Sequence, residues 1–273
     1  MRIRFWGVRG SIPVPGPSTV RVGGNTPCVE VETEQRQVVI LDAGTGIRLL
    51  GLDLAARRGG RLMAVLLFSH THWDHIQGLP FFSPARLRHN RLVILGERRM
   101  DSHLEQVLGG QMVDAYLPFT IEDLRADLLI KEVRDGEKIV VGECTTILPR
   151  SLEHPGGVFG YRIACQGKAV VYASDVSHPL GGLDPGLVDL ARGVDLLIHD
   201  AQFTPEERLR YADWGHSSWL EAVRVAQAAG AARLALFHHD PLHDDDCLEE
   251  IERQAREQYA GAFLAREGME INI

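Results

Sequence analysis

The sequence predicts a layered α/β fold, and three observations lead to that prediction. Short apolar stretches alternate with stretches of helical periodicity along most of the chain. Several apolar stretches end in a loop that carries histidine or aspartate. In α/β sheets, binding sites form at such loops, which follow the carboxyl ends of the strands. No internal repeat of about 20 to 50 residues and no low-complexity linker is visible. We therefore expect one domain over residues 1–273, with helices flanking β-sheets.

The N-terminal part of the chain is predicted to contain three strands and one helix. The strands are Met1–Trp6, Cys28–Glu32 and Gln37–Leu41. A loop rich in proline and glycine separates the first two strands, and such a loop is stiff and exposed. The helix covers Ile47–Arg58, where apolar residues have helical spacing, and Gly59-Gly60 ends it.

The remainder of the chain continues the alternation of strands and helices. Ser218 and Glu221 form a capping box ahead of a helix that ends at Gly230. The segment Gln111–Phe119 has no clear period, and we expect a loop there. The further expected strands are Met63–Phe68, Leu92–Leu95, Leu128–Val133, Lys138–Val141, Thr145–Leu148, Phe159–Ala164, Ala169–Ala173, Asp195–Ile198, Arg233–Phe237 and Met269–Ile273. The further expected helices are Arg98–Leu108, Leu183–Ala191, Ser218–Ala229 and Asp246–Gln258.

Composition excludes several functional classes. The formal net charge is −8 and the pI about 5.8, so no overall basic field attracts nucleic acid. The four cysteines lie far apart without a Cys-x-x-Cys pair, which argues against a zinc ribbon or a disulfide framework. The N-terminus lacks the apolar core of a signal peptide, and no run approaches the ~20 apolar residues that cross a bilayer. We expect a cytoplasmic protein without a membrane partner.

The strongest functional signal directly follows the apolar run Met63–Phe68. There the chain places three histidines and one aspartate within six residues, in the order His70-Thr71-His72-Trp73-Asp74-His75. A buried strand holds the loop at its end rigidly, so these side chains can converge on one point. Neutral imidazole and carboxylate groups are ligands for zinc, manganese or iron. The pattern therefore predicts a metal site.

Five segments, taken in order, resemble the successive motifs of the metallo-β-lactamase-fold hydrolases. They are Asp42 at a strand end, the His70–His75 segment, and then His154, Asp175 and His238 as single residues. The resemblance extends from Met1 to about Asp240. It implies a four-layer αββα sandwich of two mixed sheets flanked by helices, with a dinuclear metal site that is usually zinc.

The same resemblance implies a set of metal ligands. One divalent ion would bind His70, His72 and His154, while the other would bind Asp74, His75 and His238. Asp175 would bridge both ions, because a carboxylate has two oxygens. Asp42 would hold a ligand histidine by a hydrogen bond. Zinc is favoured for both ions, with manganese or iron as alternatives.

Three further features indicate a branch of this family. Aspartate at position 175, where many true β-lactamases have cysteine, argues against antibiotic hydrolysis. Ile198-His199-Asp200-Ala201-Gln202 is similar to the His-Glu-Ala-Thr motif of the phosphodiesterase branch that includes transfer-RNA 3′-end endonucleases, and Gly215-His216-Ser217-Ser218 to its His-Ser-Thr motif. The endonucleases typically insert a long arm between the third and fourth motifs. His154 and Asp175 are only 21 positions apart, so no arm fits.

These features predict a phosphodiesterase for a small or cyclic phosphodiester. Asp74 would orient the attacking water and accept its proton, and His216 would protonate the leaving oxygen. Asp200 would favour the charged form of the His216 ring. The alternatives are a transfer-RNA 3′-end endonuclease, a thioester or lactone hydrolase on the same metals, and a di-iron redox or binding protein. Nucleic acid is the less expected substrate, and relatives are often homodimers.

The remaining histidines are assigned smaller roles. His89, His103 and His243 are expected to be solvated. His178, three residues past Asp175, is expected on a surface loop, with a place in the lining of the pocket as the alternative. His239 follows a proposed ligand, and either contact with phosphate or support of that ligand fits its position.

Overall fold

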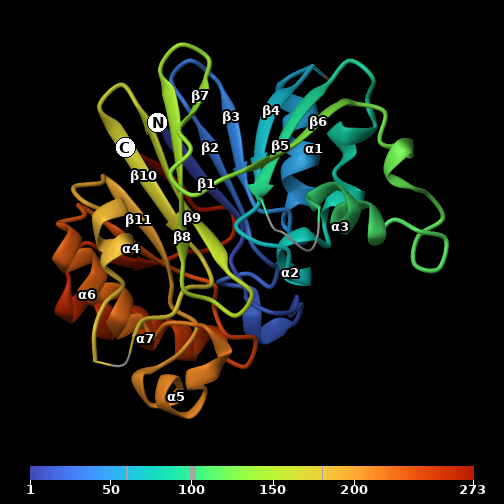
Figure 1. The fold of residues 1–273 in the computed structure, drawn as a ribbon. Coiled ribbons are helices and arrows are strands. Elements are labelled where there is room, and N and C mark those ends of the chain that lie inside the picture. The colour runs from blue at the N-terminus through green and yellow to red at the C-terminus, as the bar shows by residue number, and fades with distance from the viewer. Residues whose placement is uncertain (60, 99–102, 180) are drawn as a thin grey trace.

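Two seven-stranded sheets face each other, and helices cover their outer faces (Figure 1). The computed structural model of the chain describes residues 1–59, 61–98, 103–179 and 181–273. The strand order is β14-β1-β2-β3-β4-β5-β6 in the first sheet and β13-β12-β11-β10-β9-β8-β7 in the second. Both sheets mix parallel and antiparallel pairs. The predicted four-layer αββα sandwich is therefore confirmed.

The elements have the following bounds. The strands are β1 (Arg2–Gly7), β2 (Cys28–Glu32), β3 (Val38–Leu41), β4 (Met63–Leu67), β5 (Arg91–Glu97), β6 (Asp127–Val133), β7 (Ile139–Val141), β8 (Thr145–Leu152), β9 (Val158–Cys165), β10 (Lys168–Ala173), β11 (Leu196–Asp200), β12 (Leu234–Phe237), β13 (Ala262–Leu264) and β14 (Glu270–Asn272). The α-helices are α1 (Ile47–Arg57), α2 (Trp73–Ile76), α3 (Leu104–Gly110), α4 (Pro185–Leu190), α5 (Pro205–Arg210), α6 (Trp219–Ala229) and α7 (Asp245–Gln258). Short 3-10 helices are η1 (Pro17–Thr19), η2 (Leu79–Phe81), η3 (Ser83–Arg86), η4 (Ile121–Asp123) and η5 (Ala212–Trp214). Among the described residues, no helix has the length and apolar character needed to cross a membrane.

Alternating side chains of the strands form two separate cores. In β3, Val39 and Leu41 point into the space between the two sheets, whereas Val38 and Ile40 point toward the helices on the outer face. All four residues are buried, as expected for a central strand covered on both sides. The same chain segment thus joins the inter-sheet core to the core under α1.

Parallel pairing brings the predicted site segments to one edge. Leu41 of β3 pairs with Leu67 of β4, so Asp42 and the loop after β4 leave the first sheet side by side. In the second sheet Ala173 of β10 pairs with His199 of the parallel strand β11. Asp175, which follows β10, and Asp200, which ends β11, therefore leave this sheet at the same edge. Since the carboxyl ends of parallel strands lie at the same sheet edge, side chains distant in sequence converge there.

Several boundaries differ from those predicted. The capping box of Ser218 and Glu221 is present, and α6 starts at the residue after Ser218. Helix α5 was not predicted because its six residues are too short to show a period, although Thr204 caps it. Strand β8 continues to Leu152, past the predicted end at Leu148. Of the helix predicted over Arg98–Leu108, residues 99–102 lie outside the described residues, and α3 begins at Leu104.

Candidate metal centre

The side chains predicted to bind metal converge where the two sheets meet. They form two groups in which all ligand atoms lie within 4.8 Å of one another. The first group holds His70, His72, His154 and Asp175, and the second holds Asp74, His75, Asp175 and His238. Asp175 belongs to both groups. The structure thus brings together all seven residues, in the two sets that the sequence motifs imply.

Ring nitrogens and carboxylate oxygens face shared points within these groups. His154 Nε2 lies 3.2 Å from His72 Nδ1, and His75 Nε2 lies 3.3 Å from His238 Nε2. Asp175 Oδ1 lies 3.1 Å from His75 Nε2 and 3.0 Å from His238 Nε2. Nitrogen and oxygen atoms directed at one point are the donor arrangement that a divalent ion requires. The donor chemistry of both groups therefore fits such an ion.

One buried nitrogen supports this fit directly. His70 Nε2 is shielded from solvent and has no hydrogen-bond partner among the described residues. The closest carboxylate oxygen, Asp175 Oδ2, lies 3.6 Å away, beyond hydrogen-bonding distance. A buried polar atom without a partner is unfavourable unless another ligand satisfies it, and a metal ion would do so.

Hydrogen bonds from behind orient three of the ligand rings. His75 Nδ1 donates to Asp42 Oδ2 (2.8 Å), and His154 Nδ1 donates to the Gly215 carbonyl oxygen (2.9 Å). His238 Nδ1 donates to Gln202 Oε1 (3.0 Å). Each bond assigns the proton to Nδ1 and leaves the Nε2 lone pair directed at the centre. The predicted hydrogen bond from Asp42 to a ligand histidine is present, whereas the sequence did not indicate the role of Gln202.

Asp42 is itself held by a dense set of donors. Its Oδ1 accepts from the Ser69 amide at 2.7 Å, and its Oδ2 accepts from the Tyr172 hydroxyl at 2.7 Å. The Ser69 hydroxyl adds a further bond at 2.8 Å. Because Asp42 is fully buried, these donors are needed to stabilise its charge. Tyr172 and Ser69 are therefore functional neighbours that the sequence pattern did not reveal.

The electrostatics of the two groups differ. Burial lowers the pKa of His70 well below its usual value and also lowers the pKa of His154. Burial acts in the same direction on His75, but Asp175, Asp74 and Asp42 outweigh it and raise the pKa of His75 overall. The second group thus carries enough negative charge to attract a proton when no cation is present. A divalent cation would neutralise the same charge.

Both carboxylates among the proposed ligands remain ionised. Burial raises the pKa of Asp74, but His75 and His238 outweigh it and lower that pKa overall. The pKa of Asp175 is likewise lowered well below its usual value, because His238, His75 and His70 outweigh the effect of burial. Ionised carboxylates are the form that binds metal.

Three site residues have an unusual backbone conformation. Asp42, Asp175 and His238 each follow a buried strand, and their φ angles are 59°, 54° and 60°. Residues other than glycine rarely adopt positive φ, although aspartate and histidine tolerate it better than most. The turn sends the chain off the strand end, and such strain is typical of functional sites.

The N-terminal loop closes over the second group of ligands. The Ser11 amide donates to Asp74 Oδ2 at 2.8 Å, although the two residues lie 63 positions apart. A Cβ atom on Gly10 would lie 2.5 Å from the His238 ring, so only glycine fits between the loop and this ligand. Neither contact could be predicted from the sequence, because a backbone amide and a missing side chain leave no chemical signature.

His216 and Asp200 form a buried pair beside the second group. His216 Nδ1 lies 2.8 Å from Asp200 Oδ2, and the His216 ring stacks on His238 with centroids 5.1 Å apart. Asp200 Oδ1 accepts from the amides of Gln202 (3.0 Å) and Ser217 (3.1 Å). Burial alone would lower the pKa of His216, but Asp200 outweighs it and raises that pKa to about 9. Without a bound cation, the imidazole is therefore charged at neutral pH.

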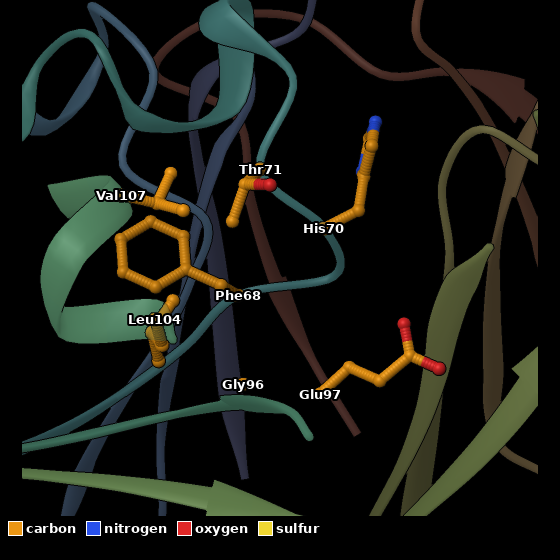
Figure 2. A pocket seen from close by; sticks show the side chains of 7 residues that line it. All are labelled: Phe68, His70, Thr71, Gly96, Glu97, Leu104 and Val107. Atoms are coloured by element: carbon orange, nitrogen blue, oxygen red, sulfur yellow. The ribbon is translucent and has the colours of Figure 1, made fainter. Parts of the chain in front are cut away.

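A small pocket lies between His70 and helix α3. Figure 2 shows Phe68, Leu104 and Val107 on one side of this pocket, with the His70 ring directed away from them. Its volume is about 10 Å³, which is room for roughly one water molecule. A substrate does not fit in this pocket.

Two predictions about other histidines were wrong. His178 and His243 are buried rather than solvated. His178 Nδ1 accepts from the Asp184 amide at 3.1 Å, and His243 Nε2 pairs with Glu207 at 3.0 Å. The prediction failed because other segments cover both loops. Arg208 of α5 donates to the His178 carbonyl oxygen (3.1 Å), and Arg9 of the N-terminal loop donates to the His243 carbonyl oxygen (2.6 Å). His239 is also buried and donates to the Ala265 carbonyl oxygen at 2.9 Å, which favours a supporting role.

Comparison with known proteins agrees with this geometry. The family model described as a beta-lactamase superfamily domain matches residues 37–239. Ribonuclease Z of Bacillus subtilis (strain 168) is 21% identical over 318 aligned positions, covering 100% of this chain and 99% of the relative. The short form of human tRNase Z has 20% identity and a TM-score of 0.73, covering 100% of this chain and 99% of that one. A diphosphatase of the PhnP family has 21% identity and a TM-score of 0.74, covering 100% of this chain and 97% of that one. The matched region contains all the proposed metal ligands, and the chain belongs to the beta-lactamase superfamily domain family.

Proposed function

We propose that this chain is a metal-dependent phosphodiesterase that uses two divalent ions and acts on a small or cyclic phosphodiester. The observation that carries the proposal is the His216–Asp200 pair beside the metal ligands. Ligand atoms of Asp175, Asp200, His216 and His238 lie within 4.8 Å of one another. An alkoxide leaving group needs a proton, and a charged imidazole next to the reacting centre supplies one.

The two donor groups would each hold one divalent ion, within one domain formed by residues 1–273. The imidazole-rich first group favours zinc, and the carboxylates of the second group also suit manganese or iron. When bound, these ions would supply an activated water and neutralise negative charge on the phosphoryl oxygens.

The chain's own residues would then handle the protons. Asp74 is ionised, and the Ser11 amide fixes its Oδ2, so we assign to it the acceptance of a proton from the attacking water. His216 Nδ1 is occupied by Asp200, which leaves Nε2 to give its proton to the leaving oxygen as the bond from phosphorus to that oxygen breaks. Asp200 would keep the ring charged before this transfer.

Two observations favour a small substrate. Strands β9 and β10, joined by the turn Gln166-Gly167, fill the interval from His154 to Asp175, so this interval contains no arm. The alignment with B. subtilis Ribonuclease Z extends over 318 positions, whereas this chain has 273 residues. The relative therefore contains segments that this chain lacks.

A transfer-RNA 3′-end endonuclease is the second candidate. Several curated relatives that align along the whole chain carry the name Ribonuclease Z, and this observation favours the candidate. The net charge of −8 argues against it, because nucleic-acid binding depends strongly on basic contacts to phosphates.

A turnover panel with the zinc- or manganese-loaded protein tests the proposal. It comprises a cyclic nucleotide, a non-aromatic cyclic phosphate, bis(p-nitrophenyl) phosphate, a thioester, a lactone and a precursor transfer RNA. We expect hydrolysis of the small phosphodiesters. Turnover confined to the thioester or lactone refutes the proposal, and turnover confined to the precursor RNA selects the second candidate.

His216→Ala separates the proton donor from the metal site. The variant should retain its metal content and lose roughly 10² to 10⁴ in turnover of a substrate with an alkoxide leaving group. A p-nitrophenyl ester needs less acid help and should lose much less. His103→Ala is the matched control, since His103 is exposed and distant in sequence from the ligands. Equal losses on both substrates contradict the assignment.

A further inference from the structure

The four tryptophans of the chain divide into two classes. Trp6 and Trp219 are buried, each with only 7% of its surface exposed, whereas Trp73 is 65% and Trp214 is 59% exposed. Other large apolar side chains, such as Val20 and Leu242, are exposed as well, so exposure alone does not mark a site. The two exposed indoles differ in that each is a neighbour in sequence of a residue that belongs to or directly supports the candidate metal centre. Both exposed tryptophans adjoin the candidate metal centre.

Trp73 lies within the metal-binding segment itself. It is the first residue of α2, between His72 and Asp74. His70, Asp74 and His75 are buried, but His72 is exposed like Trp73. The side of the centre that faces solvent is therefore the side on which His72 and Trp73 lie.

Trp214 approaches the centre from another part of the chain. It ends η5 and precedes Gly215, whose carbonyl oxygen accepts the hydrogen bond from His154 Nδ1. A Cβ on Gly215 would lie 2.1 Å from Pro155 and 2.6 Å from His154 Nδ1, and its φ is 83°. Only glycine permits this close approach, which holds the Trp214 segment against the His154 ring.

Contacts between rings connect the two tryptophan positions. The rings of His72 and His154 lie 5.0 Å apart, centroid to centroid. Trp73 follows His72 directly in the chain, and Trp214 precedes Gly215, which accepts the hydrogen bond from His154. Since consecutive Cα atoms are about 3.8 Å apart, the backbone of each tryptophan lies close to this pair of rings.

An aromatic series also links Trp214 to the proposed proton donor. Trp214 lies 5.2 Å from Tyr211, Tyr211 lies 5.5 Å from Phe203, and Phe203 lies 5.8 Å from His216, as ring centroids. These distances are typical of packed aromatic pairs. The packing fixes the position of Trp214 relative to His216 while its own ring stays accessible.

We propose that Trp73 and Trp214 recognise an aromatic ring of the substrate, a nucleobase, so that the substrate is a nucleoside phosphodiester. This inference rests on the proposed function and adds the class of its substrate. The exposed indoles offer uncharged flat faces, on which any base can stack. Recognition through a neutral base also suits a protein whose overall charge repels polyanions.

A pair of substrates with the same reacting group tests this inference. Adenosine 2′,3′-cyclic phosphate and glycerol 1,2-cyclic phosphate both contain a five-membered cyclic phosphodiester, but only the first has a base. For Trp73→Ala and Trp214→Ala we expect KM for the adenosine substrate to rise roughly 5- to 150-fold, the range that base stacking gives. At a metal content equal to that of the wild type, KM for the glycerol substrate should change much less than KM for the adenosine substrate. Phenylalanine at either position should restore most of the loss, because it retains a stacking face.

The matched control is Val140→Ala. Val140 is 59% exposed and belongs to the edge strand β7, which contains none of the proposed site residues. This variant should leave KM for both substrates unchanged. Quenching of tryptophan fluorescence by adenosine 5′-monophosphate gives a second readout that does not depend on turnover, and each Trp→Ala variant should weaken it.

The outcomes distinguish this inference from the proposed function. If the wild-type protein cleaves neither cyclic phosphate, the proposed function fails, whatever the fluorescence shows. If it cleaves both with similar KM and the Trp→Ala variants change neither KM nor quenching, the inference is overturned and the proposed function stands. If the variants impair only cleavage of a precursor transfer RNA, the inference is overturned in favour of an RNA substrate.

Discussion

Replacing Asp200 with asparagine isolates the electrostatic role of this carboxylate. Asp200 is fully buried, and its Oδ2 lies 2.8 Å from His216 Nδ1. Asparagine keeps the Oδ1 acceptor that binds the Gln202 and Ser217 amides, so the local fold should survive. Only the charge and the oxygen that faces His216 are lost.

The magnitude follows from the pKa of His216. The present value of about 9 exceeds the usual 6.5 by about 2.5 units, which corresponds to about 3 kcal/mol in favour of the charged ring. Burial opposes this, and the weaker attraction of Asp175 and Asp74 is all that remains without Asp200. The pKa of His216 should therefore return to about 6.5 or below. Without bound cations, the protonated fraction at pH 7.5 then falls about tenfold, from nearly complete to about 9%.

A pH–rate profile on a substrate with an alkoxide leaving group measures this change. Turnover requires the protonated ring, so activity falls as pH rises through the pKa of His216, and Asp200→Asn should move this decline by about 2.5 pH units toward lower pH. Bound cations lower the pKa of His216 in both proteins, so the displacement between the two profiles is the relevant quantity. An unmoved alkaline limb, with metal content equal to that of the wild type, refutes the reasoning.

Three further predictions concern metal affinity and stability. Asp42→Asn removes the charged acceptor behind His75 and should weaken metal binding roughly 10- to 100-fold, measured by competition with a chelator. Burial lowers the pKa of His178 and of His199, each to about 4, so the unfolded chain takes up protons first as pH falls below 6.5. The contribution of these two imidazoles to the free energy of unfolding should thus be fully present above pH 6.5 and should fall toward pH 4, by up to about 3 kcal/mol per imidazole, in denaturant titrations. Gly78→Ala should destabilise the protein by about 3 kcal/mol, because a Cβ there would lie 2.0 Å from a backbone carbonyl oxygen.

Each of these predictions has its control. Tyr172→Phe removes only one hydrogen bond to Asp42 and should weaken metal binding less than Asp42→Asn does. His199→Gln should reduce the slope of stability against pH, and an unchanged slope would contradict the assignment. Gly110→Ala should be nearly neutral, because a Cβ at Gly110 meets no atom within 4 Å.

The parts of the site that could be predicted are those that polar side chains mark in apolar surroundings. His70 to His75 follow a buried strand, and Asp175 and His238 do the same, so alternation of apolar runs and ligand residues located them. Parallel pairing then explains why they meet, since strand ends of a parallel pair share one edge.

The parts of the site that could not be predicted depend on backbone groups, on a glycine and on a tyrosine within an apolar strand, none of which stands out in the sequence. The Ser11 amide that binds Asp74 is a backbone group, and the space filled by Gly10 becomes meaningful only once the ring of His238 is in place. Tyr172 lies inside an apolar strand, where a tyrosine is expected to belong to the core. Its hydroxyl bond to Asp42 depends on the packing of one sheet on the other, which local sequence does not encode.

The left-handed backbone conformation at Asp42, Asp175 and His238 lowers the stability of the fold at the residues that build the site. Each such residue costs about 1 to 3 kcal/mol, which glycine would recover. Selection or design for thermostability alone would therefore tend to erase the side chains on which the metal centre depends. A protein that keeps all three tolerates this local instability, and Asp175, His238 and the carboxylate behind His75 are then in position before any ion binds.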